Sequence, residues 1–409
     1  MNILIIFPQI FYRDVIRSLT KDYNVHIIIE KYFINRIDNS EFYKYGCKIH
    51  EIETGPDVNE LPSFQTYVEK IIIENNINYI LPLTNEAMNV VISNINTKLK
   101  LPGVTSDYIN FFDKKFYYSL MNKLNVPVPK LYLKNKDTIE FPVIVKPAKG
   151  SAGIGSKILY DKDQLDEWFS IGHDKIHQFQ EKEGDQYRYW EYFSFGGDYL
   201  IQQYIESDLI TISGRIFNNK FYFDLVCDII VTDPPYCSEL EFSTPSKHNE
   251  IIINKIFEDC KKFLLEIGVD NTPFMFDVLI DKNKKHFFID FGLRMTTTPQ
   301  PILHEINKDF CKNWISQLFY GKAFILENNN KHIIHKKLNL KKGKILKCEL
   351  NSTSTFANYK LPVANSQIYN PRNDLLLDEG GFVTVTGQTI QEAVNNLNQF
   401  LSSLVVNYE

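Results

Sequence analysis

The stretch Phe141-Pro-Val-Ile-Val-Lys146-Pro-Ala-Lys-Gly150-Ser-Ala-Gly153-Ile-Gly155 is the part of the chain from which the rest can be interpreted. Its β-branched run Val143–Val145 predicts a buried strand, which Lys146 closes. The glycines that follow let backbone N–H groups approach an anion closely, because no Cβ stands in the way. A lysine at the end of the strand can add a charge-assisted contact. Alone, the stretch fits either a phosphate-binding loop or an ordinary lysine beside a flexible loop.

The spacing of these glycines differs from two common phosphate-binding motifs. A Walker A loop needs Gly-Lys followed by Ser or Thr after the turn, and a Rossmann fingerprint places its glycines directly after the first strand. The first strand here is followed by Pro8-Gln-Ile-Phe-Tyr-Arg13, which contains no glycine. A nicotinamide dinucleotide is therefore not expected.

Composition indicates an ordinary globular protein of two to four subdomains. The chain has 409 residues, 44% of them hydrophobic and 23% charged, with a net charge of −5 and no basic run, so nucleic acid is not an expected partner. The apolar Met1–Phe7 lacks a basic flank and a cleavage site, which favours a first strand over a signal peptide. No apolar segment is long enough to span a membrane. The cysteines are scattered without a CxxC pair, as in reduced cytoplasmic proteins.

Residues 1–105 alternate between strand and helix patterns, which predicts an α/β domain with a parallel sheet. The expected strands are 2–7, 25–30, 48–52 and 79–82, and the expected helices are 12–21, 64–75 and 86–95. Ligands of such sheets lie at the carboxyl ends of the strands, where loops 8–13 and 83–86 fall. Glu86 has two interpretations: an acidic first-turn residue favoured by the helix dipole, or a group that points at substrate.

The segments around the glycine loop resemble the ATP-grasp enzymes. Val-Lys146-Pro before a Gly/Ser-rich turn is similar to the nucleotide-cradling loop of that family, and Asp113-Lys114 opens a helix that leaves through Val-Pro-Val-Pro129. The resemblance implies that Lys114, Lys146 and loop residues Gly150, Ser151, Gly153 and Gly155 bind the phosphates of ATP.

Tyr199-Leu-Ile-Gln-Gln-Tyr-Ile-Glu206 resembles the hinge strand that meets adenine in the same family. By position Gln202, Gln203 and Tyr204 take the adenine-binding places, although the family usually has a Glu there. Asp208 falls where an acid that contacts ribose often lies, but the usual Gly-x-Glu is replaced by Ser-Asp-Leu.

A predicted hairpin, Pro273–Asp281 with His286–Arg294, places Asp277 and Asp290 on paired strands. Carboxylate oxygens are the ligands that Mg²⁺ prefers, and an aspartate between apolar neighbours is costly unless it is paired or metal-bound. Arg294, and Arg215 on the preceding strand 211–216, can neutralise charge during phosphoryl transfer. The remaining alternative is a hairpin with stray acidic residues.

Asp290-Phe-Gly-Leu-Arg294 resembles the "Glu-Ile-Asn-x-Arg" that ends the ATP-grasp catalytic hairpin, without its Asn ligand. Gly292 is similar to the branch that joins free amino acids, and Met295–Gln300 replaces the Gly-Gly run of that branch. The segment from Gly381 onward resembles the C-terminal β-rich domain of biotin-carboxylase-like members, and its last helix is expected over Thr389–Val405. No biotin attachment sequence or glutaminase segment occurs.

The expected architecture is thus an ATP-grasp fold of mixed α/β and α+β domains. It comprises a pre-ATP-grasp domain (1–105), a core (106–334) with a lid at about 135–205, and a β-rich module with a terminal helix (335–409). Residues 161–198 carry no specific chemistry, and loop 232–241 is a setting for specificity residues.

The resemblance implies an enzyme that uses ATP and Mg²⁺ (or Mn²⁺) to activate a carboxylate as an acyl phosphate and join it to an amine. Arg294 would be catalytic and would contact substrate, with Arg215 as a second catalytic arginine and Glu86 as a substrate residue. The alternatives are a bicarbonate-using carboxylase, a purine-type ligase, and a nucleotide-binding protein without activity. The expected partners are small molecules, and a homodimer is one expected assembly.

Overall fold

The computed structural model describes residues 1–8, 12–30, 40–53, 61–83, 86–133, 138–149, 156–170, 199–232, 239–295, 299–326, 331–341, 343–351, 357–362, 364, 367–368 and 381–409. The glycine-loop residues Gly150, Ser151, Gly153 and Gly155 lie outside these ranges, as do residues 171–198 of the segment without assigned chemistry. None of the described helices is both long and apolar enough to cross a membrane.

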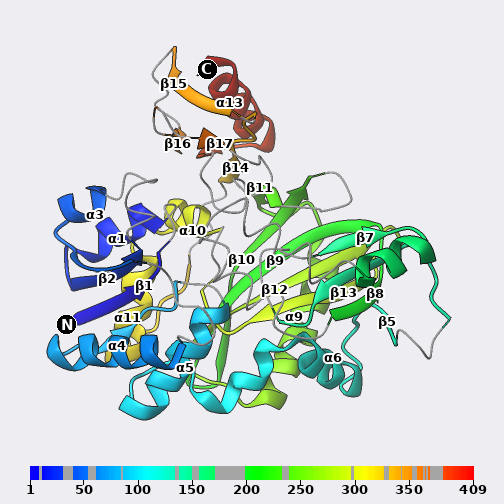
Figure 1. The fold of residues 1–409 in the computed structure, drawn as a ribbon, viewed down its shortest axis with the longest axis horizontal. Helices are drawn as coiled ribbons and strands as arrows, with labels where there is room; N and C mark the ends of the chain where they lie inside the picture. The colour runs from blue at the N-terminus through cyan, green and yellow to red at the C-terminus, as the bar shows by residue number, and fades with distance from the viewer. Residues whose placement is uncertain are drawn as a thin grey trace.

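A parallel sheet with helices on both faces begins the chain, as the alternating pattern predicts (Figure 1). The strand order is β3-β2-β1-β4. Ile3 and Ile5 of β1 face a core shared with α1, while Leu4 and Ile6 face α4 and α5. The elements are β1 (Asn2–Ile6), α1 (Arg13–Leu19), β2 (Asn24–Glu30), α3 (Ser40–Lys44), β3 (Lys48–Ile52), α4 (Leu61–Glu74), β4 (Tyr79–Ile80) and α5 (Glu86–Leu99).

The centre of the molecule is an antiparallel sheet whose described strands run β13-β12-β9-β10-β11-β14-β18-β16. One face of β9 and β12 packs on the amphipathic helix α9, which ends at Gly268 in the left-handed conformation (φ 67°). The other face joins the core of the N-terminal sheet. The bounds are β9 (Ser207–Phe217), β10 (Lys220–Val231), β11 (Glu239–Thr244), α9 (Glu250–Ile267), β12 (Thr272–Asp281), β13 (His286–Gly292) and β14 (His332–Lys337).

A smaller antiparallel sheet, β5-β8-β6-β7, carries the strand that ends in the predicted phosphate lysine. Its strands are β5 (Leu131–Tyr132), β6 (Val143–Pro147), β7 (Lys157–Leu159) and β8 (Tyr199–Gln203). The 3-10 helix η2 (Ser106–Phe112) and helix α6 (Lys114–Lys123) lead into it. β6 and β8 are direct neighbours, so the lysine strand and the predicted hinge strand lie side by side.

Helices α10 (Gln300–Ile306) and α11 (Phe310–Tyr320) join the two main sheets. Trp314 of α11 donates its indole N–H to the Tyr79 hydroxyl at 3.0 Å. Just past β13, the backbone N–H of Met295 bonds to the carbonyl of Pro82 at 3.3 Å. The carboxyl edge of the N-terminal sheet therefore lies next to the end of the predicted catalytic hairpin, as ligand binding at that edge requires.

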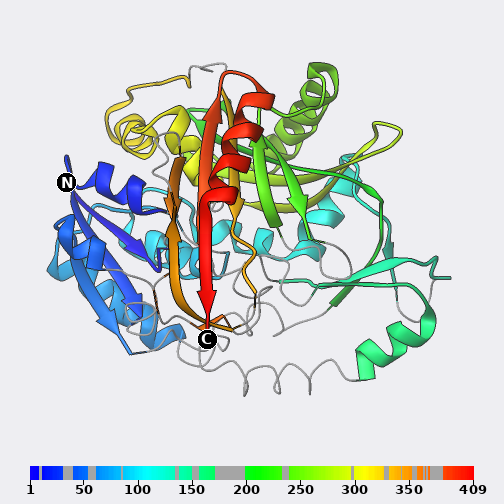
Figure 2. The ribbon, with the colours of Figure 1, turned by 90° about the horizontal axis from the view of Figure 1, so that it is seen from above.

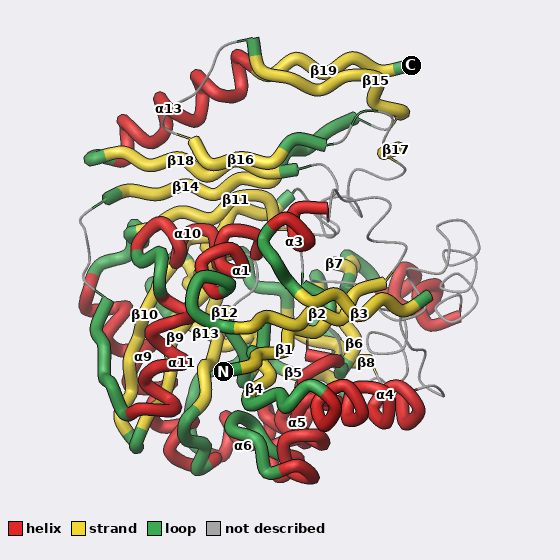
Figure 3. Tube along the Cα trace, turned by 90° about the vertical axis from the view of Figure 1, so that its left-hand side faces the viewer, coloured by secondary structure: helices red, strands yellow, loops and turns green. Residues whose placement is uncertain are grey.

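The C-terminal part extends the central sheet and adds a second small sheet (Figure 3). β16 (Ala357–Lys360) and β18 (Phe382–Gly387) continue the sheet beyond β14, and α13 (Ile390–Ser403) packs on them. β14 spans the predicted boundary at residue 334, so the sheet crosses it; the division into domains stays a prediction. The second sheet is β17 (Gln367–Ile368), β15 (Gly343–Leu350) and β19 (Leu404–Tyr408).

The expected terminal helix over Thr389–Val405 is too long. α13 ends at Ser403, and residues Leu404–Tyr408 form β19, which pairs antiparallel with β15 (Figure 2). Val405 and Val406 are β-branched residues that fit a strand better than the last turn of a helix. Strand pairing with a distant segment thus overrides the continuation of the helical pattern.

Candidate active site

The first turn of α6 places Lys114 beside the catalytic hairpin. Asp113 caps the helix by accepting a hydrogen bond from the Lys115 backbone N–H at 2.9 Å. The Lys114 backbone N–H bonds to the carbonyl of Ala148 at 2.8 Å, which fixes the helix to the exit of β6. The Lys114 side chain is 10% exposed, and its Nζ lies 3.3 Å from Oδ1 of Asp290. The sequence therefore brings a lysine and a carboxylate together from segments far apart in the chain.

Lys146 lies at the end of β6 and is 7% exposed. Its Nζ donates to the Tyr118 hydroxyl at 2.7 Å and to the Ile289 carbonyl at 3.1 Å. Burial and the nearby charge of Lys114 lower the pKa of Lys146 to about 7, although Asp290 and Asp277 act in the opposite direction. The Lys146 ammonium is thus bound to the carbonyl of Ile289, the residue that directly precedes Asp290.

Asp277 and Asp290 are opposite each other on β12 and β13. Burial and the negative charges of Glu239 and Asp290 raise the pKa of Asp277 well above its usual value. Burial also acts on Asp290, but Lys114, Lys146 and the Tyr117 hydroxyl outweigh it, so the pKa of Asp290 is lowered. The environment of Asp290 thus favours ionisation, whereas that of Asp277 disfavours it.

Arg294 follows β13 and is 6% exposed. Its guanidinium donates to the Met295 carbonyl at 3.1 Å, and its charge favours the ionised form of Asp277. Because Met295 also bonds to Pro82, the arginine lies between the hairpin and the N-terminal sheet. Contacts and charge effects link five of the predicted residues into one cluster: Lys114, Lys146, Asp277, Asp290 and Arg294.

The predicted hinge lies on β8, next to β6. The Gln203 backbone N–H donates to the Lys130 carbonyl at 2.8 Å, and the Tyr204 backbone N–H donates to the Pro142 carbonyl at 3.3 Å. Both N–H groups therefore form hydrogen bonds within the small sheet and the segments next to it. Gln202 is 1% exposed, and its Nε2 makes no hydrogen bond of ordinary geometry with the described residues, although its side chain lies close enough to the Tyr118 hydroxyl to oppose the rise in the pKa of that group. A buried amide donor without a partner is costly, and a nucleotide base with an acceptor would satisfy it.

Asp208 is already paired within the protein. It accepts from Lys247 Nζ at 2.7 Å and lies 3.5 Å from Nε2 of His248. Its side chain is more exposed than that of Asp290. A role toward ribose would require it to share this lysine, and that role stays a prediction.

Arg215 lies in a different environment from the cluster. Its guanidinium donates to Asp224, to Gln317 Oε1 at 2.9 Å and to the Phe324 carbonyl. Its Cζ atom lies 3.7 Å from the centre of the Phe324 ring. It is four residues along β9 from Thr211, the register partner of Asp277, which is about 13 Å at the rise of a strand. These contacts favour a structural role over the catalytic role predicted from sequence.

Glu86 is the first residue of α5, at the carboxyl edge of the N-terminal sheet. The position of its side chain lies outside the described part of the structure, so its predicted substrate role is untested. The same holds for the glycines of the phosphate loop.

Sequence reasoning did not single out Glu239. A β-bulge shifts the register so that Glu241 pairs with Ile230 and Glu239 with Val231. Ile230 and Val231 lie on opposite faces of β10, so the bulge turns Glu239 to the face that Asp277 occupies. The charge effect of Glu239 on the pKa of Asp277 agrees with this placement. The only sequence signal is the pair of glutamates Glu239 and Glu241, two positions apart at the start of β11, and it does not reveal the bulge.

The described residues contain no group of three or more His, Cys, Asp or Glu side chains arranged for a metal ion. Asp277 and Asp290 are therefore a two-carboxylate site, which suits Mg²⁺ that takes its other oxygens from phosphates and water. The adjacent lysines suit the phosphates. The described residues thus fit a nucleotide with its metal ion.

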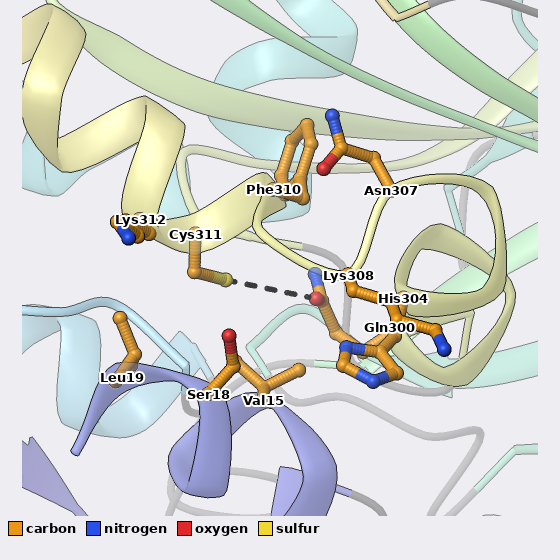
Figure 4. Close-up of a pocket in the computed structure, with 10 residues that line it drawn as sticks. All are labelled: Val15, Ser18, Leu19, Gln300, His304, Asn307, Lys308, Phe310, Cys311 and Lys312. Carbon is orange, nitrogen blue, oxygen red and sulfur yellow. Dashed lines mark hydrogen bonds between the residues drawn. The ribbon is translucent and has the colours of Figure 1, made fainter. Parts of the chain in front are cut away.

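A pocket lined by residues of α1, α10 and α11 lies outside this cluster (Figure 4). Gln300 and Cys311 face each other in it, and the Cys311 thiol also lies 3.7 Å from the sulfur of Met295. It contains none of the predicted nucleotide residues. This hollow is packing space behind Met295, and we do not assign the reaction to it.

Comparison with known proteins supports the interpretation of this geometry. Residues 113–183 match the family model described as "Carbamoyl-phosphate synthase L chain, ATP binding domain". The structure is similar to the L-amino acid ligase of Bacillus licheniformis, with a TM-score of 0.76 and 14% identity over 100% of this chain and 98% of that one.

Two further solved structures are similar along the whole chain. The biotin carboxylase domain of the Hydrogenobacter thermophilus 2-oxoglutarate carboxylase, a dimer with MgADP and bicarbonate, has a TM-score of 0.76 at 16% identity, covering 100% of this chain and 90% of that one. Phosphoribosylglycinamide synthetase of Anaerococcus prevotii has a TM-score of 0.71 at 15% identity, covering 100% and 99%. The resemblance seen in the sequence is confirmed: the protein has the ATP-grasp fold.

Proposed function

We propose that this protein is an ATP-dependent carboxylate–amine ligase that releases ADP and phosphate. The observation that carries the proposal is the ion pair between Lys114 of α6 and Asp290 of β13, with Lys146 beside it. In this proposal, two lysines that would bind phosphates lie next to two carboxylates that would bind a metal ion. An arrangement of this kind serves phosphoryl transfer, which needs mainly positioning and charge neutralisation.

Lys114 and Lys146 would hold the phosphates of ATP, and Asp277 with Asp290 would hold Mg²⁺ or Mn²⁺. When bound, the metal ion neutralises phosphate charge and polarises the phosphoryl group. Gln202 would donate its unpartnered amide to adenine. The glycine loop, with Gly150, Ser151, Gly153 and Gly155, would close over the phosphates.

The first chemical step forms a bond between a substrate carboxylate oxygen and the γ-phosphorus of ATP and breaks the bond to the β-phosphate oxygen. The products are an acyl phosphate and ADP. Arg294 would stabilise the negative charge on the transferring group. In the second step an amine attacks the acyl carbon, inorganic phosphate leaves with the electron pair of the C–O bond, and the nitrogen loses a proton to give an amide.

The amine is recognised, in this proposal, by Glu239. Its carboxylate shares the sheet face of Asp277, on the side toward the N-terminal domain. An ammonium group placed there would be attracted by the negative charge of Glu239. This position supports an amino acid or amino sugar as the acceptor, as the Gly292 resemblance implies.

The test incubates the enzyme with ATP, Mg²⁺, hydroxylamine and a panel of carboxylic acids. Acyl phosphates react with hydroxylamine to give hydroxamates, so a carboxylate-dependent hydroxamate that is lost in Arg294→Ala supports the proposal. Release of AMP and pyrophosphate in place of ADP would contradict it, because the β–γ bond would then remain intact.

Two alternatives have distinct outcomes in the same assay. The similarity to a biotin carboxylase domain favours a carboxylase as the second candidate, which would release ADP with bicarbonate and no added carboxylate. A binding protein without activity would release no ADP with any substrate. The charged side chains that phosphoryl transfer needs are all present in the five-residue cluster, which supports the ligase over the inactive protein. The cluster comprises Lys114, Lys146, Asp277, Asp290 and Arg294.

We further propose that the protein acts in the cytoplasm as a homodimer. The scattered cysteines support the first point, and all five described cysteines are free thiols. Light scattering at micromolar concentration tests the homodimer. A measured mass equal to that of a single 47.9 kDa chain would contradict it.

A further inference from the structure

One hydroxyl group connects the three elements that build the phosphate site. The Tyr118 hydroxyl on α6 accepts a hydrogen bond from Lys146 Nζ of β6 at 2.7 Å and donates to the Ile289 carbonyl of β13. Tyr118 is fully buried, and its ring packs edge-on against Tyr117 at 4.8 Å between ring centres. Ile289 directly precedes Asp290, so this hydroxyl connects the phosphate lysine with the strand that carries the carboxylate.

These contacts determine how the ammonium can meet a ligand. A lysine ammonium has three N–H donors. One goes to Tyr118 and one to the Ile289 carbonyl at 3.1 Å, which leaves a single donor for a phosphate oxygen. The ammonium also lies 5.3 Å from the centre of the Tyr118 ring, within the range of a cation–π contact. Tyr118 thus restrains both the position and the direction of Lys146.

Its neighbour Tyr117 acts at a different point. The Tyr117 hydroxyl donates to Oδ1 of Asp290 at 3.0 Å, and Lys114 approaches the same oxygen at 3.3 Å. The two adjacent tyrosines of α6 therefore hold the two sides of the site separately: Tyr117 the carboxylate and Tyr118 the lysine.

We propose that Tyr118 is a positioning residue that orients the Lys146 ammonium toward the phosphates of ATP. The inference rests on the proposed function only in that Lys146 binds phosphate. Tyr118 touches neither substrate nor metal ion in this scheme and acts through Lys146.

The test compares ATP and adenosine as ligands of Tyr118→Phe, which keeps the ring and removes only the hydroxyl. Binding is measured by calorimetry in EDTA, so that no metal ion contributes. We expect ATP affinity to fall by about 10-fold, the usual effect of losing one hydrogen bond to a charged group. Adenosine affinity stays unchanged, because adenosine has no phosphates. A purely structural hydroxyl would lower both affinities equally, and an unchanged ATP affinity would also overturn the proposal.

A double-mutant cycle with Lys146→Met gives the second readout. If Tyr118 acts through Lys146, then Tyr118→Phe causes no further loss of ATP affinity once the lysine is absent. Tyr79→Phe is the matched control, because Tyr79 is equally buried and accepts a hydrogen bond from Trp314 away from the site. That control should leave ATP affinity unchanged. An additive loss in the double variant contradicts the proposal.

Failure of the proposed function can be recognised separately. If no carboxylate supports ADP release but the ATP and adenosine results hold, the ligase proposal fails and the role of Tyr118 stands. If Tyr118→Phe does not fold by circular dichroism, Tyr118→Met is measured with the same two ligands and the same criteria.

Discussion

Asp277 and Asp290 are direct partners on neighbouring strands, yet their pKa values shift in opposite directions. Burial dominates at Asp277, whereas at Asp290 it is outweighed by Lys114, Lys146 and Tyr117. The arrangement keeps one ionised carboxylate to hold the lysines in the absence of ligand. It disfavours ionisation of the second carboxyl group, an effect that a bound metal ion would offset.

The two aspartates should therefore differ in their effect on stability. Asp290→Asn leaves Lys114 and Lys146 without their anion, and we expect a loss of about 3–5 kcal/mol in the free energy of unfolding. Asp277→Asn removes an acid that is costly to ionise, so the ligand-free protein should become more stable by about 1 kcal/mol. Both variants should lose Mg²⁺-dependent ADP release. Urea unfolding in EDTA provides the measurement.

The two aspartates should also change the free energy of unfolding in opposite directions as pH rises. The folded pKa of Asp277 is raised, so above the unfolded value of about 4 the folded state binds more protons and stability falls as pH rises. The advantage of Asp277→Asn over the wild type should therefore grow from pH 5 to pH 8. The folded pKa of Asp290 is lowered, so its contribution is present above about pH 4 and is lost as pH falls through the folded value. Equal stability losses in the two variants would contradict this assignment.

Binding of ATP should be linked to proton uptake at Lys146. Its pKa of about 7 leaves the side chain mostly neutral at pH 8 in the free protein, and phosphate oxygens favour the charged form. We expect an uptake of up to about one proton per ATP bound in EDTA. Calorimetry in two buffers of different ionisation enthalpy measures it. Uptake that persists unchanged in Lys146→Met would assign the proton to another group.

The local sequence predicts which elements carry the two lysines, whereas their phosphate-binding role is predicted from the ATP-grasp resemblance. A β-branched strand ends at Lys146, and Lys114 follows Asp113 at the start of a helix, which Asp113 caps. Asp277 and Asp290 are brought opposite each other by a hairpin whose turn is visible in the sequence. The strand end, the helix start and the hairpin turn depend on residues that are close in the sequence, so one sequence is enough to predict them.

Other features depend on contacts that no local pattern encodes. Arg215 has the alternating spacing of a residue on the Asp277 face, but its partners Asp224, Gln317 and Phe324 come from other elements. The bulge that re-aims Glu239 arises from pairing between β10 and β11. The end of α13 is set by pairing of β19 with β15, at the distant residues 343–350.

Arg215 should contribute to stability rather than to catalysis. Arg215→Met leaves the buried carboxylate of Asp224 without its cation, and we expect a loss of about 3–5 kcal/mol in unfolding free energy. Adding Asp224→Leu removes the unpaired charge and should recover much of that loss. Turnover per folded molecule should match the wild type in the double variant. A loss of hydroxamate formation as large as that in Arg294→Ala would restore the catalytic role predicted from sequence.

Glu239 should affect the amine and leave the first half of the reaction intact. Glu239→Gln removes the charge that shares a sheet face with Asp277, so we expect the KM for the amine to rise about 10-fold, as for loss of one charge-assisted contact. Hydroxamate formation should persist, because hydroxylamine at high concentration replaces the amine and needs no anionic recognition. Glu241→Gln is the matched control, since Glu241 lies across the bulge and pairs with Lys336 at 2.7 Å. Equal changes in the amine KM for the two variants would show that the bulge does not direct Glu239 into the site.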